Sequence, residues 1–236
     1  MSKPPSVIEF IKKKLELFMK KSFILFLSVI LTVLLFNTGC ATKQESSEPV
    51  EQKYDFVADI DSFDIGSYNL LVSHNLIDEK ITEIFLSFSP RTNCIIGKAR
   101  IGANLVSFTF DYEQRIKMLD AVNQYKYEFE NGKLTNRKPT KKNAYFIDKS
   151  FVSWGMLGYG HDVTTEFFTN VEFLEPTKPY FKIQFLSQEE PGYDDVYSPR
   201  FSIFISPSQW DKIIQACNQE DLEYKSTQVV DEAYEF

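Results

Sequence analysis

The chain has 236 residues and a formal net charge of −7. Six of its 26 basic and two of its 33 acidic residues lie in the first 40 positions. The rest of the chain therefore carries 20 basic and 31 acidic residues, a net charge of −11. An acidic surface argues against binding to nucleic acid and against adhesion to anionic lipid, because both need basic patches.

The N-terminal region has the pattern of an export signal. Lys20 and Lys21 precede an apolar run over residues 23–36, which is typical of the charged and apolar parts of a secretory signal. A helix of that length spans about 21 Å, less than the roughly 30 Å hydrocarbon core. Counted over residues 22–41 the segment is long enough to span, so a signal-anchored membrane protein without lipidation is the alternative.

A cysteine ends this signal. The small residues Thr38 and Gly39 directly precede Cys40, and a polar stretch follows. This resembles the lipobox of bacterial lipoproteins, with Asn37 where the family usually has an apolar residue. The resemblance implies that residues 1–39 are a signal peptide and that the thiol of Cys40 is acylated. Membrane lipid would then hold the protein in the cell envelope, on the inner or outer membrane, facing the periplasm or the cell surface.

The flanking segments complete the predicted domain organisation. Residues 1–18 are explained by an over-extended start or, alternatively, by an amphipathic extension. Residues 40–53 hold almost nothing that could form a core, so we expect a flexible tether. Residues 54–236 are enough for one extracytoplasmic domain with a sizeable core.

The first half of this domain predicts strands followed by a helix. The alternation of Asp and apolar residues over 59–64 fits an edge strand. Further strands are expected over 81–90, 94–101 and 105–110. Asp111 then caps a helix, with Gln114 three residues on. The apolar face of this helix is predicted to be Tyr112, Ile116, Leu119 and Val122.

The middle of the chain holds a basic segment and a glycine-rich one. Residues 133–143 contain five Lys or Arg and predict an exposed loop. Residues 154–162 contain three glycines that allow unusual backbone angles, and the end of a strand over 151–157 overlaps them. The aromatic and polar side chains there could contact a small ligand, and a simple glycine-rich turn is the alternative. The residues of this candidate ligand loop are Trp154, Tyr159, His161 and Asp162.

The second half repeats the order of the first. Strands are predicted over 165–174, 180–186 and 200–205, and Ser206 caps a helix with Gln209 three residues on. The apolar face of this helix is expected to be Trp210, Ile213, Ile214 and Cys217. The segments 110–124 and 205–219 align at a constant offset of 95 in cap, capping glutamine and apolar spacing.

These patterns predict an α+β fold, mainly antiparallel sheet with two amphipathic helices packed on it or at its ends. The alignment favours an internal duplication of a β-β-β-α unit, with pseudo-repeats over about 81–130 and 165–230. Each unit would end in a polar or strand-like tail, at 125–130 and at 222–230.

The sequence contains no established catalytic, metal-binding or phosphate-binding motif. His74 and His161 lie far apart in sequence, and no metalloprotease, redox, nucleophile-elbow or phosphate-binding pattern occurs. The acidic loop 189–195 suits Ca²⁺ only as a minority interpretation, so no metal or cofactor is predicted. Whether Cys94 and Cys217 form a disulfide is left open.

We therefore expect a membrane-anchored lipoprotein that is not an enzyme, acting as a binding or envelope-structural module. Its expected partners are membrane lipid through Cys40 and a protein or small ligand, but not nucleic acid. The alternative is an envelope hydrolase that uses His161 and Asp162 with a distant nucleophile. An imidazole within hydrogen-bond reach of a second titratable group, in a cleft, would favour that alternative.

Overall fold

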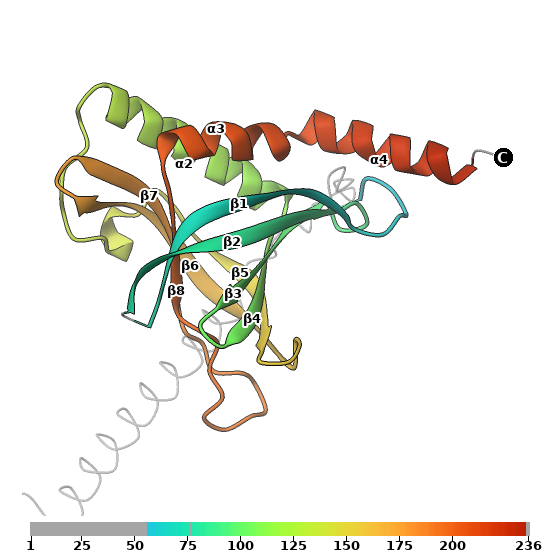
Figure 1. Cartoon of the computed structure of the whole chain (residues 1–236), viewed down its shortest axis with the longest axis horizontal. Coiled ribbons are helices and arrows are strands. Elements are labelled where there is room, and N and C mark those ends of the chain that lie inside the picture. Colours follow the sequence, from blue (N-terminus) through green and yellow to red (C-terminus); the bar gives the residue numbers. More distant parts are fainter. Residues whose placement is uncertain (1–55, 76, 235–236) are drawn as a thin grey trace, which may run out of the picture. The chain divides into compact units, whose positions relative to one another are not determined.

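The computed structural model describes residues 56–75 and 77–234 (Figure 1). The predicted signal peptide, Cys40 and the tether lie outside these residues. Contacts divide the chain into Met1–Glu51 and Gln52–Phe236, and the second unit is described here by itself. Among the described residues, no helix is both long and apolar enough to cross a membrane.

Eight antiparallel strands form a closed barrel in which each strand pairs with the next and β1 closes against β8. The strands are β1 Phe63–His74, β2 Ile77–Ser89, β3 Cys94–Ile101, β4 Asn104–Phe110, β5 Ile147–Gly155, β6 His161–Glu175, β7 Lys178–Phe185 and β8 Phe201–Ile205. The predicted antiparallel pairing is confirmed. The closure itself was not predicted.

The helices gather at one end of the barrel (Figure 1). They are α2 Tyr112–Glu130, the short 3₁₀ helix η1 Lys141–Asn143, α3 Pro207–Ala216 and α4 Gln219–Tyr234. Since β4 and β8 run in the same direction, the helices α2 and α3 that follow them start at the same rim. Both predicted helix starts are confirmed. Gln114 N donates to Asp111 Oδ1 at 2.8 Å, and Ser206 N donates to Gln209 Oε1 at 2.9 Å.

Two predicted tails are in fact helical. Residues 125–130 continue α2 because Tyr125 is fully buried against the ring of Phe181 and donates its hydroxyl hydrogen to Pro179 O at 2.8 Å. Residues 222–230 belong to α4, where Leu222 and Ser226, one helical turn apart, are both buried. In both segments the buried residues follow helical spacing, and the interpretation as polar or strand-like tails is wrong.

The predicted apolar face of α2 is partly wrong. Ile116 is 43% and Leu119 36% exposed, whereas the buried residues include Met118, Ala121 and Val122. The most buried side of α2 is therefore centred on Met118 and Val122, and Ile116 and Leu119 lie at its border. The face predicted for α3 is confirmed, with Trp210 and Ile213 buried.

Each half of the domain contributes four strands, whereas the predicted unit had three. The order β1–β4 then α2 is followed by β5–β8 then α3. Of the predicted edge strand at 59–64, only Phe63 and Asp64 lie in a strand, at the start of β1. They pair with β2, whereas β8 pairs with β1 only over Leu71–His74. The order of elements is compatible with duplication, and superposition of the two halves stays a prediction.

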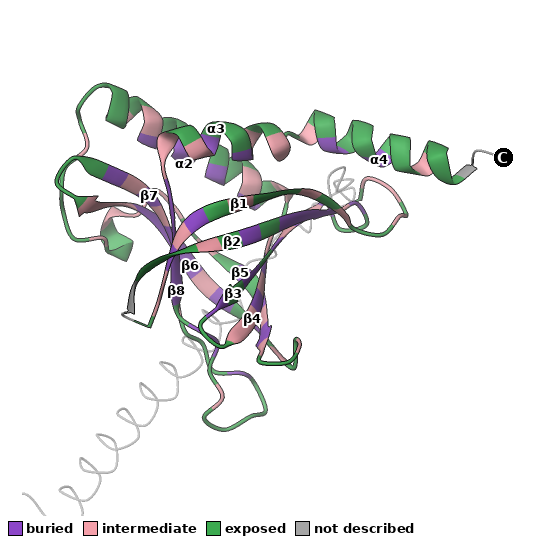
Figure 2. Ribbon diagram, viewed as in Figure 1, coloured by how far each residue is buried: buried purple, intermediate pink, exposed green. Residues whose placement is uncertain are grey.

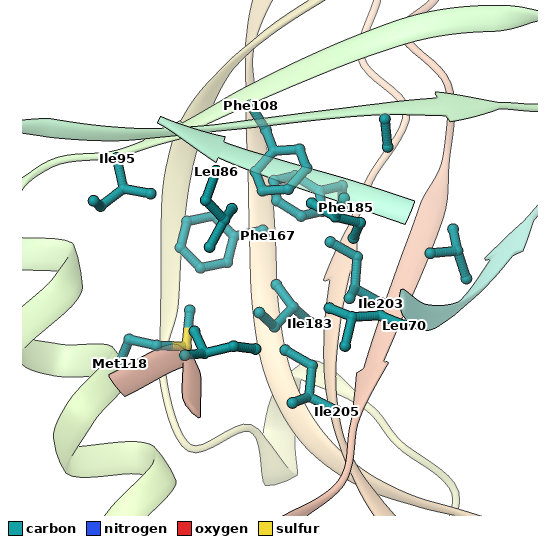
Figure 3. Close-up of a cluster of buried hydrophobic side chains, with 14 of the residues drawn as sticks. Leu70, Leu86, Ile95, Phe108, Met118, Phe167, Ile183, Phe185, Ile203 and Ile205 are labelled. Carbon is teal, nitrogen blue, oxygen red and sulfur yellow. The ribbon is translucent and has the colours of Figure 1, made fainter. Parts of the chain in front are cut away.

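Aromatic rings fill the middle of the barrel (Figure 3). Phe185 stacks on Phe201 with ring centroids 4.4 Å apart and lies 5.1 Å from the ring of Phe108. The opposite residue on β3 is Gly97, and a Cβ there would lie 2.3 Å from Cζ of Phe108. Glycine at this position therefore lets the Phe108 ring lie across the barrel. Buried residues alternate with more exposed ones along β3 and β5, as expected where one face of a strand points into the barrel, whereas β8 is buried throughout (Figure 2).

Candidate functional site

An apolar cavity of about 400 Å³ lies at the helix end of the barrel. Strands β1–β4, β7 and β8 supply its floor, and α2, α3 and the first residues of α4 border it. The apolar lining residues are Leu70, Ile84, Leu86, Ile95, Phe108, Phe110, Ile116, Met118, Leu119, Val122, Ile183, Ile203, Ile205, Trp210, Ile213 and Ile214. In Figure 3 the side chain of Met118 on α2 points toward Leu86 and Ile183 of the barrel. The inward-facing side chains of the strands and of α2, including all four residues of the predicted face of α2, therefore create one shared apolar space.

α3 is held over this space by polar contacts with β1. Strand β8 pairs with only the second half of β1, so the backbone of β1 before Leu71 needs other partners. Gln209 Nε2 donates to Asn69 O at 3.1 Å, and Tyr68 Oη donates to Lys212 O at 3.4 Å. The first turn of α3 thus completes the rim where the strand pairing stops.

One cation borders the cavity. Arg115, in the first turn of α2, is the only basic residue among the described lining residues. Burial lowers the pKa of its guanidinium, which nevertheless stays charged at neutral pH. None of the ion pairs between described residues includes Arg115. Arg115 was not among the residues predicted from the sequence. Its spacing was the available signal, because it precedes Met118 by three positions and Val122 by seven and so lies on the same side of the helix.

Cys217 lies at the C-terminal end of α3 and also lines the cavity. Cys94 and Cys217 are not joined to each other by a disulfide, which answers the question that the sequence left open. Burial raises the pKa of the Cys217 thiol from 9.0 to about 11, although the charge of Arg115 acts in the opposite direction. The thiol is therefore protonated at physiological pH and nucleophilically inert.

We predict that Cys217 reacts slowly with iodoacetamide. At pH 8 the raised pKa lowers the thiolate fraction, and hence the alkylation rate, by about 100-fold relative to an ordinary thiol. Peptide-resolved mass spectrometry of the native and urea-unfolded chain would give the two rates in the same sample. A native rate within tenfold of the unfolded one would contradict the buried position of this thiol.

The predicted ligand loop lies at the opposite end of the barrel. Trp154 of β5 and His161 of β6 are register partners, and their rings stack with centroids 5.5 Å apart. Trp154 is buried and His161 is half-buried, whereas Tyr159 is largely exposed in the loop between them. The structure thus brings two of the four predicted residues together.

The partner of His161 is Glu190 and not Asp162. His161 Nδ1 lies 2.7 Å from Oε2 of the buried Glu190, while Oε1 of the same carboxylate accepts from the backbone N–H of Asp162 at 3.1 Å. Tyr193 adds an edge-to-face ring contact with His161. Glu190 therefore ties the acidic loop to the start of β6. Sequence spacing could not show this, because the two segments meet only in the folded barrel.

The other candidate segments have ordinary contacts. Asp59 and Asp61 accept hydrogen bonds from Arg91 at 2.7 and 3.0 Å. Residues 133–143 form a mostly exposed loop, as predicted. Within residues 56–75 and 77–234, no group of three His, Cys, Asp or Glu side chains is arranged to hold a metal ion.

The described domain is an eight-stranded antiparallel barrel whose helix-covered end encloses an apolar cavity. The chain belongs to a family described as an uncharacterised Treponema protein, whose model matches residues 11–224. It is similar to an uncharacterised protein of Treponema pallidum (strain Nichols), with 23% identity over 136 residues that cover 58% of this chain and 49% of the relative. The chain therefore spans about half the length of that curated relative. No solved structure matches the chain.

Proposed function

We propose that this is an exported, lipid-anchored protein that binds a small apolar ligand at the helix end of its barrel. The observation that carries the proposal is the cavity of about 400 Å³ with its apolar lining. Cys40 supplies the anchor, and the barrel acts by binding and not by catalysis.

The size of the cavity supports a binding role. Protein interiors are close-packed and contain few voids larger than a water molecule. Sites for small ligands have volumes of about 300–1,000 Å³ and a mostly apolar lining. An eight-stranded barrel either fills its interior with side chains or leaves room for one small ligand. Here the aromatic rings fill the middle of the barrel, and the cavity between the barrel and the helices has room for such a ligand.

The anchor is supported by the residues around Cys40. Small residues precede the cysteine and a polar segment follows it. The chain after residue 40 carries a net charge of −11, which disfavours adhesion to anionic lipid. Attachment would therefore rest on acyl chains, each buried methylene contributing about 0.8 kcal/mol. In cells grown with an alkyne-tagged fatty acid, the wild type should become labelled at the mature N-terminus and Cys40→Ala should not. Equal labelling of Cys40→Ala would overturn the anchor.

Binding can be tested on the full chain in lipid nanodiscs with a neutral probe, a photoreactive and alkyne-tagged hexadecanol. We expect crosslinks in peptides from α2 and α3, and we expect excess unlabelled hexadecanol to suppress them. Crosslinks confined to other peptides, or crosslinks that hexadecanol does not suppress, would overturn the binding proposal.

A second candidate is an envelope hydrolase, because His161 lies within hydrogen-bond distance of Glu190. A carboxylate that orients an imidazole is the arrangement of a general base. The carboxylate that orients His161 would then be Glu190, and not Asp162 as the sequence suggested. A fluorophosphonate probe that labels the wild type but not His161→Ala would support it, and equal labelling of both proteins would count against it.

A further inference from the structure

Arg115 is the one basic residue among the described lining residues of a mostly apolar cavity, which Glu220 also borders. It extends from the first turn of α2, is partly buried and lines the space together with Met118 and Val122. A charge near an apolar space costs free energy unless a partner compensates for it. The hydrogen bonds of this guanidinium therefore decide whether Arg115 only stabilises the fold or can also bind a ligand.

Only one nitrogen of Arg115 is engaged by the hydrogen bonds that the structure defines. Nη2 donates to Asn93 O at 3.0 Å, to Asn93 Oδ1 at 2.6 Å and to Gln219 Oε1 at 2.9 Å. All three acceptors are neutral amide oxygens. They tie the β2–β3 turn and the start of α4 to α2, which is a sufficient structural role for Nη2.

No hydrogen bond within the fold explains the position of Arg115 Nε. It is buried and has no hydrogen-bond partner. The guanidinium lies 5.7 Å from the ring centroid of Phe88 and 5.5 Å from that of Tyr112, so two aromatic faces fix its plane. A guanidinium held in this way presents a preformed donor to a planar anion. An unpaired buried donor is costly, and a ligand oxygen would remove that cost.

A second donor at the cavity is also unpaired. Trp210 of α3 lines the space and is 4% exposed, and its Nε1 has no hydrogen-bond partner among the described contacts. A purely hydrocarbon ligand would leave both Trp210 Nε1 and Arg115 Nε unsatisfied. A ligand with a polar head would satisfy at least one of them.

We propose that Arg115 binds the carboxylate of a single-chain amphiphile whose alkyl chain fills the cavity. This inference rests on the proposed binding function and adds the chemical class of the ligand. The volume is near the lower limit for small-ligand sites, which favours one alkyl chain over a two-chain lipid. The flat carboxylate matches the planar donor edge of a guanidinium. Neither Asp111 nor Glu220 forms an ion pair with Arg115 among the described residues, so its charge favours an anion over an alcohol.

The test uses the same neutral photoreactive hexadecanol as tracer and compares three unlabelled competitors on the full chain in nanodiscs. They are hexadecanoic acid, hexadecanol and hexadecyl phosphate, at a pH at which the acid is ionised. We expect hexadecanoic acid to displace the tracer at roughly tenfold lower concentration than hexadecanol, or lower still, since a hydrogen bond to a charged group is stronger than a neutral one.

Variants assign the effect to the guanidinium. Arg115→Gln should bring the two competitors to within about threefold of each other, while Arg115→Lys keeps the charge and part of the preference. Arg100→Gln is the matched control, because Arg100 is exposed beside the β3–β4 turn at the other end of the barrel. It should leave the ratio unchanged. If Arg115→Gln does not fold, the wild-type ratio and Arg115→Lys still decide the question.

The outcomes separate the two proposals. Equal displacement by acid and alcohol on the wild type would overturn the carboxylate assignment and leave apolar binding in place. Stronger displacement by hexadecyl phosphate than by the acid would overturn it in favour of a phosphate monoester. A tracer that no competitor displaces would overturn the binding function itself.

Discussion

Leu86→Trp is expected to abolish tracer crosslinking at the helix end of the barrel. Leu86 is buried on β2 and borders the cavity, so an indole at this position would occupy the space that the ligand needs. Adding atoms to a filled core costs about 1–3 kcal/mol. If the space is open, the larger side chain should cost less than about 1 kcal/mol, because it replaces void with contacts.

Phe85→Trp is the matched control for this substitution. Phe85 is the preceding residue on the same strand, and its half-exposed side chain is on the outer face of the barrel. This variant should crosslink like the wild type. Thermal unfolding followed by intrinsic fluorescence would give the stability of both variants. Normal crosslinking of Leu86→Trp, or a loss of stability as large as in a filled core, would mean that the cavity is not the binding site.

Phe185→Ala is expected to cause the largest loss of stability, about 3–5 kcal/mol. Phe185 is fully buried on β7, and its ring contacts those of Phe108, Phe167 and Phe201. The substitution removes apolar surface and leaves a void among stacked rings that cannot collapse onto it. Since domains are stable by only about 5–15 kcal/mol, much of the barrel's stability would be lost.

Pulse proteolysis in urea would measure this change on the full chain. Phe151→Ala provides the control, because Phe151 is 46% exposed on the outer side of β5. Its loss should stay below about 1 kcal/mol. A cost of less than about 2 kcal/mol for Phe185→Ala would show that the ring cluster does not determine the stability of the barrel.

Local chemistry explains why several elements were predictable. The cap and capping glutamine at Asp111 and Gln114 form the expected pair of hydrogen bonds, which need only neighbouring residues. Strand β3 has the predicted bounds, since its alternation ends at the turn at Gly102. The strand β1 was mostly missed because its apolar residues are interrupted by Gly66 and by polar residues.

The candidate sites depend on longer-range contacts. His161 was selected for its neighbours in sequence, Trp154 and Asp162, but its carboxylate partner is Glu190 from the loop after β7. Arg115 was not selected at all, because its significance comes from what surrounds it. Asn93 from the β2–β3 turn and Gln219 from α4 hold one nitrogen, and the cavity lies beside the rest of the side chain.

The sequence by itself determined the antiparallel strands, the two capped helices and the acidic surface, and it predicted an anchor at Cys40. These follow from periodicity, cap residues and charge, which act over a few neighbouring positions. Only the tertiary structure decided that the strands close into a barrel, through pairing between β1 and β8 at opposite ends of the domain. Closure brings residues of six strands and three helices around one space, and that space makes Arg115 a candidate ligand-binding residue.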